Sequence, residues 1–195
     1  MRRLFSMSIV ALAISSGLLG GRPAVAADNY EYDLVHSSIS FKARHLDISY
    51  VHGRFNSASG KFTIDRDDPS KSSFELTIKA DSVDTGNKGR DDHLRNADFF
   101  DVNQYPTITF KSTAVKAARG GYEVTGDFTM HGKTQKITLA LEGGKEITDP
   151  MGTKKIGLST DVVIKRSDYG MSKKMIGPML ADDVKVSIDL EAAKK

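Results

Sequence analysis

Residues 81–112 read DSVDTGNKGRDDHLRNADFFDVNQYPTITFKS, and this stretch interrupts the alternation of apolar and polar residues that surrounds it. Within it, Leu94, Ala97 and Phe100 recur at helical spacing between charged residues. Pro106 marks the return to an extended chain, because the residue before a proline is pushed out of the helical region. The stretch therefore predicts one short helix, roughly in mid-chain, in a protein that is otherwise made of strands.

Outside this stretch the chain reads as short amphipathic strands joined by turns. Ile39, Phe41 and Ala43, for example, alternate with polar residues. No run is apolar on both faces, which favours an antiparallel sheet with one solvated face over a parallel α/β sheet. About eight such strands form either a sandwich or a barrel. The predicted fold class is mainly β, with the helix closing or capping the sheet.

An eight-stranded barrel is just wide enough to be filled by side chains or to hold one slender ligand. The inward positions include three small residues, Ala43, Ala80 and Gly126. Small inward residues leave room for a ligand, but they also accommodate neighbouring aromatic rings. The alternation alone leaves both interpretations open.

Residues 1–27 have the three parts of a secretory signal peptide. Arg2 and Arg3 form a positive start, a short apolar run follows, and Ala24-Val25-Ala26 is a cleavage signal. The apolar run is too short to span a bilayer comfortably. We expect cleavage near Ala26, a periplasmic location without stable membrane insertion, and a single domain over residues 28–195.

The charge balance depends on this cleavage. The whole chain has 28 basic residues against 25 acidic ones, and the leader carries three arginines and no acid. The mature chain therefore holds 25 of each sign, which argues against a nucleic-acid partner, because such a partner requires a persistent basic surface. The chain has no cysteine, so its core must hold the fold together without disulfides.

Four blocks of sequence resemble the YceI-like family. They are SVDT at 82–85, RDDHLRNADFFDVNQYPTITFKS at 90–112, GDFTMHGKTQKITL at 126–139 and RSDYGM at 166–171, and the resemblance covers nearly all of 29–192. It implies an eight-stranded antiparallel, lipocalin-like barrel whose apolar tunnel holds a polyisoprenoid or another long-chain lipid. It also implies export to the periplasm and no established catalytic role. The resemblance favours a cavity over a packed interior.

The predicted ligand-binding wall consists of large apolar residues at inward positions. They are Phe41, Phe55, Phe62, Phe74, Leu76, Ile78, Phe110, Phe128, Leu139 and Ile164. A long lipid chain in contact with such a wall binds tightly without many polar contacts, because each methylene removed from water contributes about 0.8 kcal/mol.

Three polar residues are candidate contacts for a lipid head group. His45 and Arg166 continue the inward parity of their strands, so both are expected near one end of the barrel interior. A buried arginine must be paired or must bind an anion. Arg166 therefore either pairs with an acid such as Asp168 or binds the head group. Arg90 either pairs with a nearby acid to hold the helix or contacts the ligand.

No pattern in the chain indicates catalysis. The five histidines show no H-x-x-x-H spacing, no cysteine is available as a ligand, and nucleophile-elbow, P-loop and dinucleotide fingerprints are absent. We expect a non-catalytic binding protein without a metal or other cofactor. The alternative is a ligand-free barrel, acting in stress response or protein interaction through its outer surface. A homodimer is left open.

Overall fold

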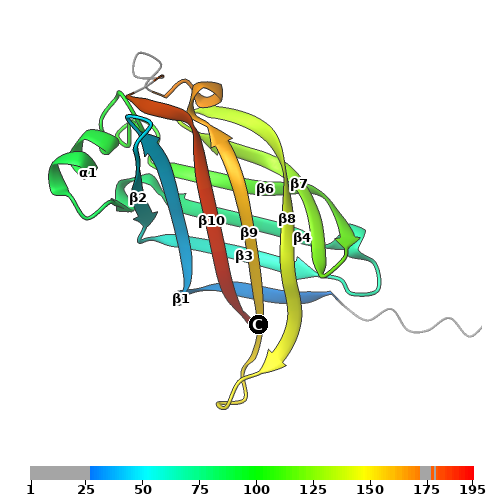
Figure 1. Cartoon of the computed structure of the whole chain (residues 1–195). Coiled ribbons are helices and arrows are strands. Elements are labelled where there is room, and N and C mark those ends of the chain that lie inside the picture. The colour runs from blue at the N-terminus through cyan, green and yellow to red at the C-terminus, as the bar shows by residue number, and fades with distance from the viewer. Residues whose placement is uncertain (1–26, 172–176, 178) are drawn as a thin grey trace, which may run out of the picture.

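The strands of the barrel follow one another as neighbours around a sheet that closes on itself (Figure 1). The computed structural model describes residues 27–171, 177 and 179–195. Within these residues the strands are β1 (Asp28–His45), β2 (Ser49–Phe55), β3 (Ala58–Ile64), β4 (Ser73–Lys79), β5 (Val83–Asp84), β6 (Thr107–Ala118), β7 (Gly121–Met130), β8 (Lys133–Thr148), β9 (Lys154–Lys165) and β10 (Leu180–Lys194). Short 3-10 turns lie at Pro69–Lys71, Ala80–Ser82 and Arg166–Tyr169.

The ten strands of the described part occupy eight positions around the ring. The long strand β1 pairs with β3 through its first residues and with β2 through its last ones, so β2 and β3 act as one interrupted strand. β4 and β5 continue each other in the same way, beside β3 and β2. β10 pairs with β1 and closes the ring. All pairs between these strands are antiparallel, so the predicted eight-stranded antiparallel barrel with one short helix is confirmed.

The helix α1 (Lys88–Arg95) is shorter than the sequence pattern predicts. The side chain of Asn87 caps its start by accepting a hydrogen bond from the backbone N–H of Arg90. Asn96 is extended and ends the helix, so the prediction that Ala97 and Phe100 share a helical face with Leu94 is wrong. Ala97 is exposed, whereas Phe100 is buried against the barrel.

Side chains around Thr85 hold the start of α1 against the end of β5. The buried carboxylate of Asp91 accepts hydrogen bonds from the Thr85 N–H at 2.8 Å and from the Thr85 hydroxyl at 2.5 Å. Arg90 donates from Nε to Thr85 Oγ1 at 2.7 Å and from Nη2 to the Thr85 carbonyl at 2.9 Å. Arg90 thus holds the helix, through threonine rather than through the acid that the sequence predicted as its partner.

One end of the barrel, called here the closed end, is filled by tightly packed side chains. Tyr30, Ile64 and Ile156 are almost completely buried there. The Tyr30 hydroxyl donates to Glu146 at 2.6 Å, and Arg66 donates to the same hydroxyl at 3.1 Å. Hydrogen bonds from Lys154 and Tyr30 lower the pKa of Glu146 to about 2. The other end carries α1 and is called the helix end (Figure 1). Among the described residues, no helix has the length and apolar character to cross a membrane.

Candidate ligand-binding cavity

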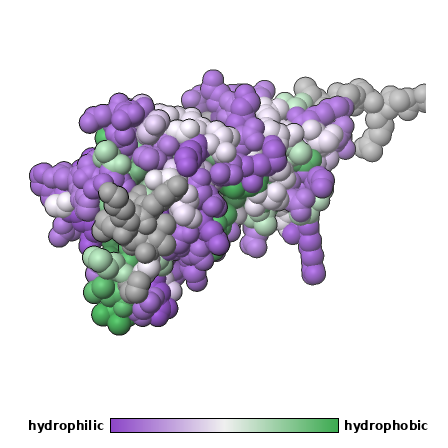
Figure 2. All heavy atoms as spheres, turned by 90° about the horizontal axis from the view of Figure 1, so that it is seen from above, coloured by the Kyte–Doolittle hydropathy of each residue, from purple (hydrophilic) through white to green (hydrophobic). Residues whose placement is uncertain are grey.

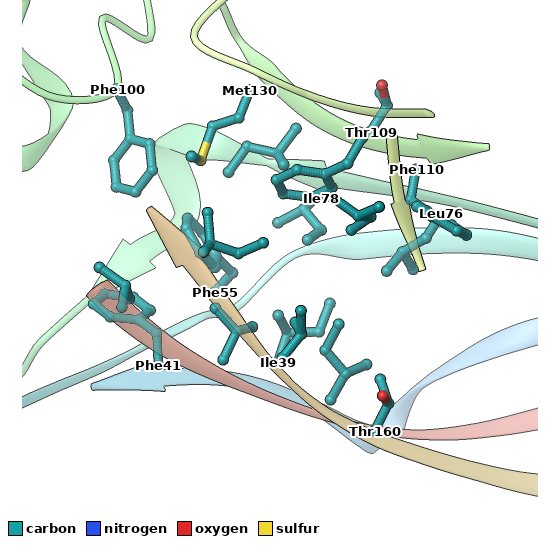
Figure 3. Close-up of a pocket in the computed structure, with 18 of the residues that line it drawn as sticks. Ile39, Phe41, Phe55, Leu76, Ile78, Phe100, Thr109, Phe110, Met130 and Thr160 are labelled. Carbon is teal, nitrogen blue, oxygen red and sulfur yellow. The ribbon is translucent and has the colours of Figure 1, made fainter. Parts of the chain in front are cut away.

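An apolar cavity of about 180 Å³ lies between the closed end and the helix end (Figure 3). Its wall takes side chains from every position of the ring, because inward residues alternate with outward ones along each strand. At the helix end, Leu94, Phe99 and Phe100 cover the cavity. Phe100 packs edge-on against Phe55, with ring centroids 5.5 Å apart, and Phe55 contacts Phe41 at 5.6 Å. This aromatic cluster joins the segment after α1 to β1 and β2.

The structure places all ten predicted wall residues on this cavity. They come from β1, β2, β3, β4, β6, β7, β8 and β9, and Figure 3 shows the labelled members Phe41, Phe55, Leu76, Ile78 and Phe110 around one space. Their contact with a lipid stays a prediction.

Several inward apolar side chains are only partly buried although they point into the barrel. Val186 and Ile188 of β10 and Val162 of β9 line the cavity and keep intermediate exposure. At the closed end of the same two strands, Ile156 and Ala192 are each 1% exposed. Because the three partly exposed side chains form part of the cavity wall, we attribute their remaining accessible surface to the cavity. The barrel is therefore packed at one end and hollow towards the other.

The sequence left open whether the small inward residues leave room for a ligand or for neighbouring aromatic rings, and the structure shows examples of both. Ala43 lines the cavity. Gly126 instead makes room for an aromatic ring, since a Cβ there would lie 2.6 Å from the Phe110 ring. Gly53 lies against Phe41 in the same way. Ala80 is 1% exposed, lies in a 3-10 turn and is not part of the cavity wall.

Arg166 is a cationic member of this apolar wall, and its guanidinium is only partly satisfied. The residue is 5% exposed. Its Nε and Nη2 donate to the carbonyl of Ala181 at 3.1 and 2.9 Å, and Nη2 also donates to the carbonyl of Leu180 at 3.0 Å. Nη1 has no hydrogen-bond partner among the described residues. Desolvation by burial lowers the pKa of Arg166, and the nearby charge of Asp182 partly opposes that effect.

The predicted acidic partner of Arg166 is therefore replaced by backbone carbonyls at the start of β10. Asp182 is the acid whose charge raises the pKa of Arg166. Its carboxylate accepts hydrogen bonds from the Ser167 N–H at 2.8 Å and from the Ser167 hydroxyl at 2.6 Å. Arg166 forms no ion pair within the described ranges. A buried guanidinium without an ion pair is costly, so an anion entering the cavity would gain from meeting it.

The structure does not bring His45 and Arg90 into the cavity wall. His45 is the last residue of β1, and the chain turns at Leu46, whose φ is 52°, so the alternation that pointed His45 inward ends there. The donors of Arg90 are taken by Thr85. Neither residue has geometric support as a head-group contact.

Comparison with known proteins identifies the family. The model of the YceI-like domain matches residues 30–192. The chain belongs to the YceI-like family. A UPF0312 protein of Pseudomonas aeruginosa is 35% identical over 194 residues, which cover 98% of this chain and 100% of that protein. Protein YceI of Shigella flexneri is 35% identical over 190 residues, covering 96% and 98% of the two chains.

Solved structures of three similar proteins share the fold. BcnA of Burkholderia cenocepacia is 27% identical, with a TM-score of 0.73 over 82% of this chain and 98% of that one. The YCEI protein of Campylobacter jejuni is 35% identical, with a TM-score of 0.70 over 77% and 89%. A polyisoprenoid binding domain from Saccharophagus degradans is 19% identical, with a TM-score of 0.64 over 85% and 98%, and it supports the fold alone.

Some residues of the cavity wall were not predicted from the sequence. Four inward residues of β10 line the cavity, Val184, Val186, Ile188 and Leu190, and their strict alternation could have identified them. Thr160 of β9 also lies on the wall, and its hydroxyl has no hydrogen-bond partner in the described part of the chain. Thr160 could have been predicted to point inward, because it lies two residues before Val162 and four before Ile164 on the same strand.

One group of metal-ligating side chains lies outside the cavity, where donor atoms of Asp33, His36 and Glu191 come within 4.8 Å of one another. The hydrogen bond from His36 is the largest of the effects that lower the pKa of Asp33 to about 2. The ammonium group of Lys155 forms ion pairs with Asp33 at 3.3 Å and with Glu191 at 3.5 Å. Lysine thus already supplies the positive charge between these carboxylates.

Proposed function

We propose that the protein is a periplasmic carrier that holds a long-chain isoprenoid or another lipid in its cavity. The observation that carries the proposal is the apolar cavity in the barrel, several of whose lining side chains stay partly exposed. Burying ten methylenes in such a space contributes about 8 kcal/mol before the costs of ordering. The name of the polyisoprenoid binding domain that shares the fold is the reason to test an isoprenoid first.

The proposed role is binding rather than catalysis. The wall is apolar apart from Thr85, Thr109, Thr160 and Arg166, and these residues offer no nucleophile–base pair within the described part of the chain. The periplasmic location rests on the leader predicted over residues 1–27, nearly all of which lies outside the described residues.

Native mass spectrometry of the protein purified from its own host tests the carrier role. We expect a fraction of the protein to carry a lipid-sized mass, and the delipidated protein to bind farnesyl or longer isoprenoid chains with a rise in melting temperature. Protein that is isolated empty, and that shows neither uptake nor a thermal shift after delipidation, would exclude the carrier. The outer surface would then be the place to look for function.

Replacing Arg166 tests whether the head group is anionic. We expect Arg166→Gln to weaken palmitate binding about tenfold more than hexadecanol binding, because charge-assisted hydrogen bonds to an anion are about twice as strong as neutral ones. Both affinities are measured by fluorescence displacement on the folded variant. If the two ligands lose equal affinity while the melting temperature falls, Arg166 serves only to hold β10 through the carbonyls of Leu180 and Ala181.

A further inference from the structure

Exposed apolar side chains gather at the rim of the helix end. Ile48 is 82% exposed and Leu46 is 47% exposed in the turn between β1 and β2, and Met179, which is 57% exposed, lies beside them. The Leu46 N–H donates to the Met179 carbonyl at 3.2 Å and ties the two segments together. Figure 2 shows the molecule from above, with hydrophobic atoms gathered at one edge. Single exposed hydrophobic residues are ordinary, but a cluster marks an interaction surface.

This apolar rim, Leu46, Ile48 and Met179, adjoins the cavity. β1 ends at His45, which is paired with Leu180 of β10. Leu180 follows Met179 in the chain and lines the cavity. Its carbonyl accepts one of the hydrogen bonds from Arg166. Whatever covers the apolar rim therefore lies directly beside the helix end of the cavity.

A basic row crosses the outer face just behind the rim. Lys42 of β1 lies opposite His52 of β2 on one side and opposite Lys185 of β10 on the other. Like charges directly opposite each other destabilise a sheet. Neither lysine forms an ion pair among the described residues, and Lys42 lies over the ring of Tyr50 at 5.4 Å. A row of this kind is suited to an external anionic partner.

The acids of the same rim are engaged within the protein. Asp47 pairs with Arg44 at 3.2 Å, and Asp182 accepts the hydrogen bonds of Ser167. A further acid, Asp183, lies opposite Lys165 in the sheet. On the outer face behind the apolar rim, Lys42 and Lys185 face each other and supply positive charge.

We propose that the apolar rim docks on the surface of an anionic lipid bilayer, with Lys42 and Lys185 against the head groups. Lys42 precedes Leu46 by four residues, roughly 13 Å along the strand, so the basic row lies at head-group level when the rim enters the acyl boundary. A second copy of the chain fits less well, since three side chains expose far less than the ~800 Å² that each partner buries in a stable interface. Docking in this orientation turns the helix end of the cavity towards the lipid.

Vesicle co-sedimentation of the mature protein tests the apolar part of the proposal. The probes are vesicles of phosphatidylcholine mixed with phosphatidylglycerol, and vesicles of phosphatidylcholine alone. We expect Ile48→Ser to weaken binding to the anionic vesicles about tenfold, through loss of a buried isoleucine side chain. The matched control is Met151→Ser, because Met151 is 88% exposed in the turn between β8 and β9 and lies away from the rim. This control should bind like the parent protein.

The charge part is tested on the same vesicles. We expect Lys185→Gln to weaken binding to anionic vesicles about fivefold and to leave binding to phosphatidylcholine unchanged. Lys116→Gln serves as control, because Lys116 pairs with Glu123 at 3.4 Å on a different part of the sheet. Added salt should reduce the anionic preference of the parent protein.

The result that would overturn the proposal is equal loss in Ile48→Ser and Met151→Ser, or no binding of the parent protein to anionic vesicles. Lipid uptake into the cavity is separated from docking by Val162→Trp, which fills the cavity wall and leaves the rim intact. Undiminished vesicle binding by this variant supports a surface contact. Loss of vesicle binding in a folded Val162→Trp protein would show that uptake, not the rim, holds the vesicle.

Discussion

Val162→Trp should block lipid uptake while the barrel still folds. Val162 lies on the cavity wall of β9, opposite Val186 of β10, and both side chains keep intermediate exposure towards the cavity. The indole ring would occupy space that about four methylenes of the ligand otherwise fill, which costs about 3 kcal/mol or roughly 100-fold in affinity. Because the added volume enters a void, the melting temperature of the lipid-free protein should change little.

The next residue on the strand provides the control. Val163 points outward and is 52% exposed, so Val163→Trp adds the same side chain on the other face of the sheet. We expect this variant to bind lipid like the parent protein. Thermal midpoint and uptake of a fluorescent isoprenoid are measured on the same samples. A Val162→Trp protein that binds lipid normally, or that is clearly destabilised by overpacking, would mean that this part of the barrel is not hollow.

A second pair of variants compares the two halves of the barrel by stability alone. Ile156→Ala should lower the free energy of unfolding by about 4 kcal/mol, because the side chain is 1% exposed and its removal leaves a cavity in the packed closed end. Ile188→Ala removes the same atoms from the wall of an existing cavity, so we expect a loss of only about 1–2 kcal/mol. The corresponding falls in melting temperature are about 2–4 °C for each kcal/mol in a chain of this size.

Urea unfolding of both lipid-free variants measures this difference. An equal m-value in the two variants assures that the free energies can be compared. Equal losses of stability would show that Ile188 is packed as tightly as Ile156. The hollow half would then be absent in solution, and the basis for the carrier role would be removed without any lipid having been tested.

The cavity wall could be predicted because the barrel obeys a local rule. In a strand every second residue faces the same side, so the alternation around Phe41, Phe74 and Phe128 identified the inward set before closure of the sheet was known. The same rule failed at His45, where the strand ends and the chain turns. It also left open whether small residues make a void, because Gly126 and Ala43 both have inward parity, although Gly126 makes room for the Phe110 ring and Ala43 lines the cavity.

The remainder depends on individual hydrogen bonds, which the alternation of apolar and polar residues does not encode. Arg166 meets the carbonyls of Leu180 and Ala181, which lie beyond a connection that the sequence does not position. The end of α1 depends on Asn96, whose side chain accepts a hydrogen bond from the N–H of Asp98 and competes with continuation of the helix. Such competition between local hydrogen bonds and helical spacing cannot be read from periodicity.

Closure of the ring by β1 and β10 has a consequence for the order of folding. The strands that meet at this seam begin and end the described barrel, with Phe41 opposite Val186 and Tyr30 opposite Lys194. Contacts of such long sequence separation slow folding, and until Leu180–Lys194 are available the edges of β1 and β9 that β10 covers have no neighbour. Unpaired edges of this kind can recruit other chains. The nascent barrel is therefore most vulnerable to aggregation in the interval before its last strand arrives.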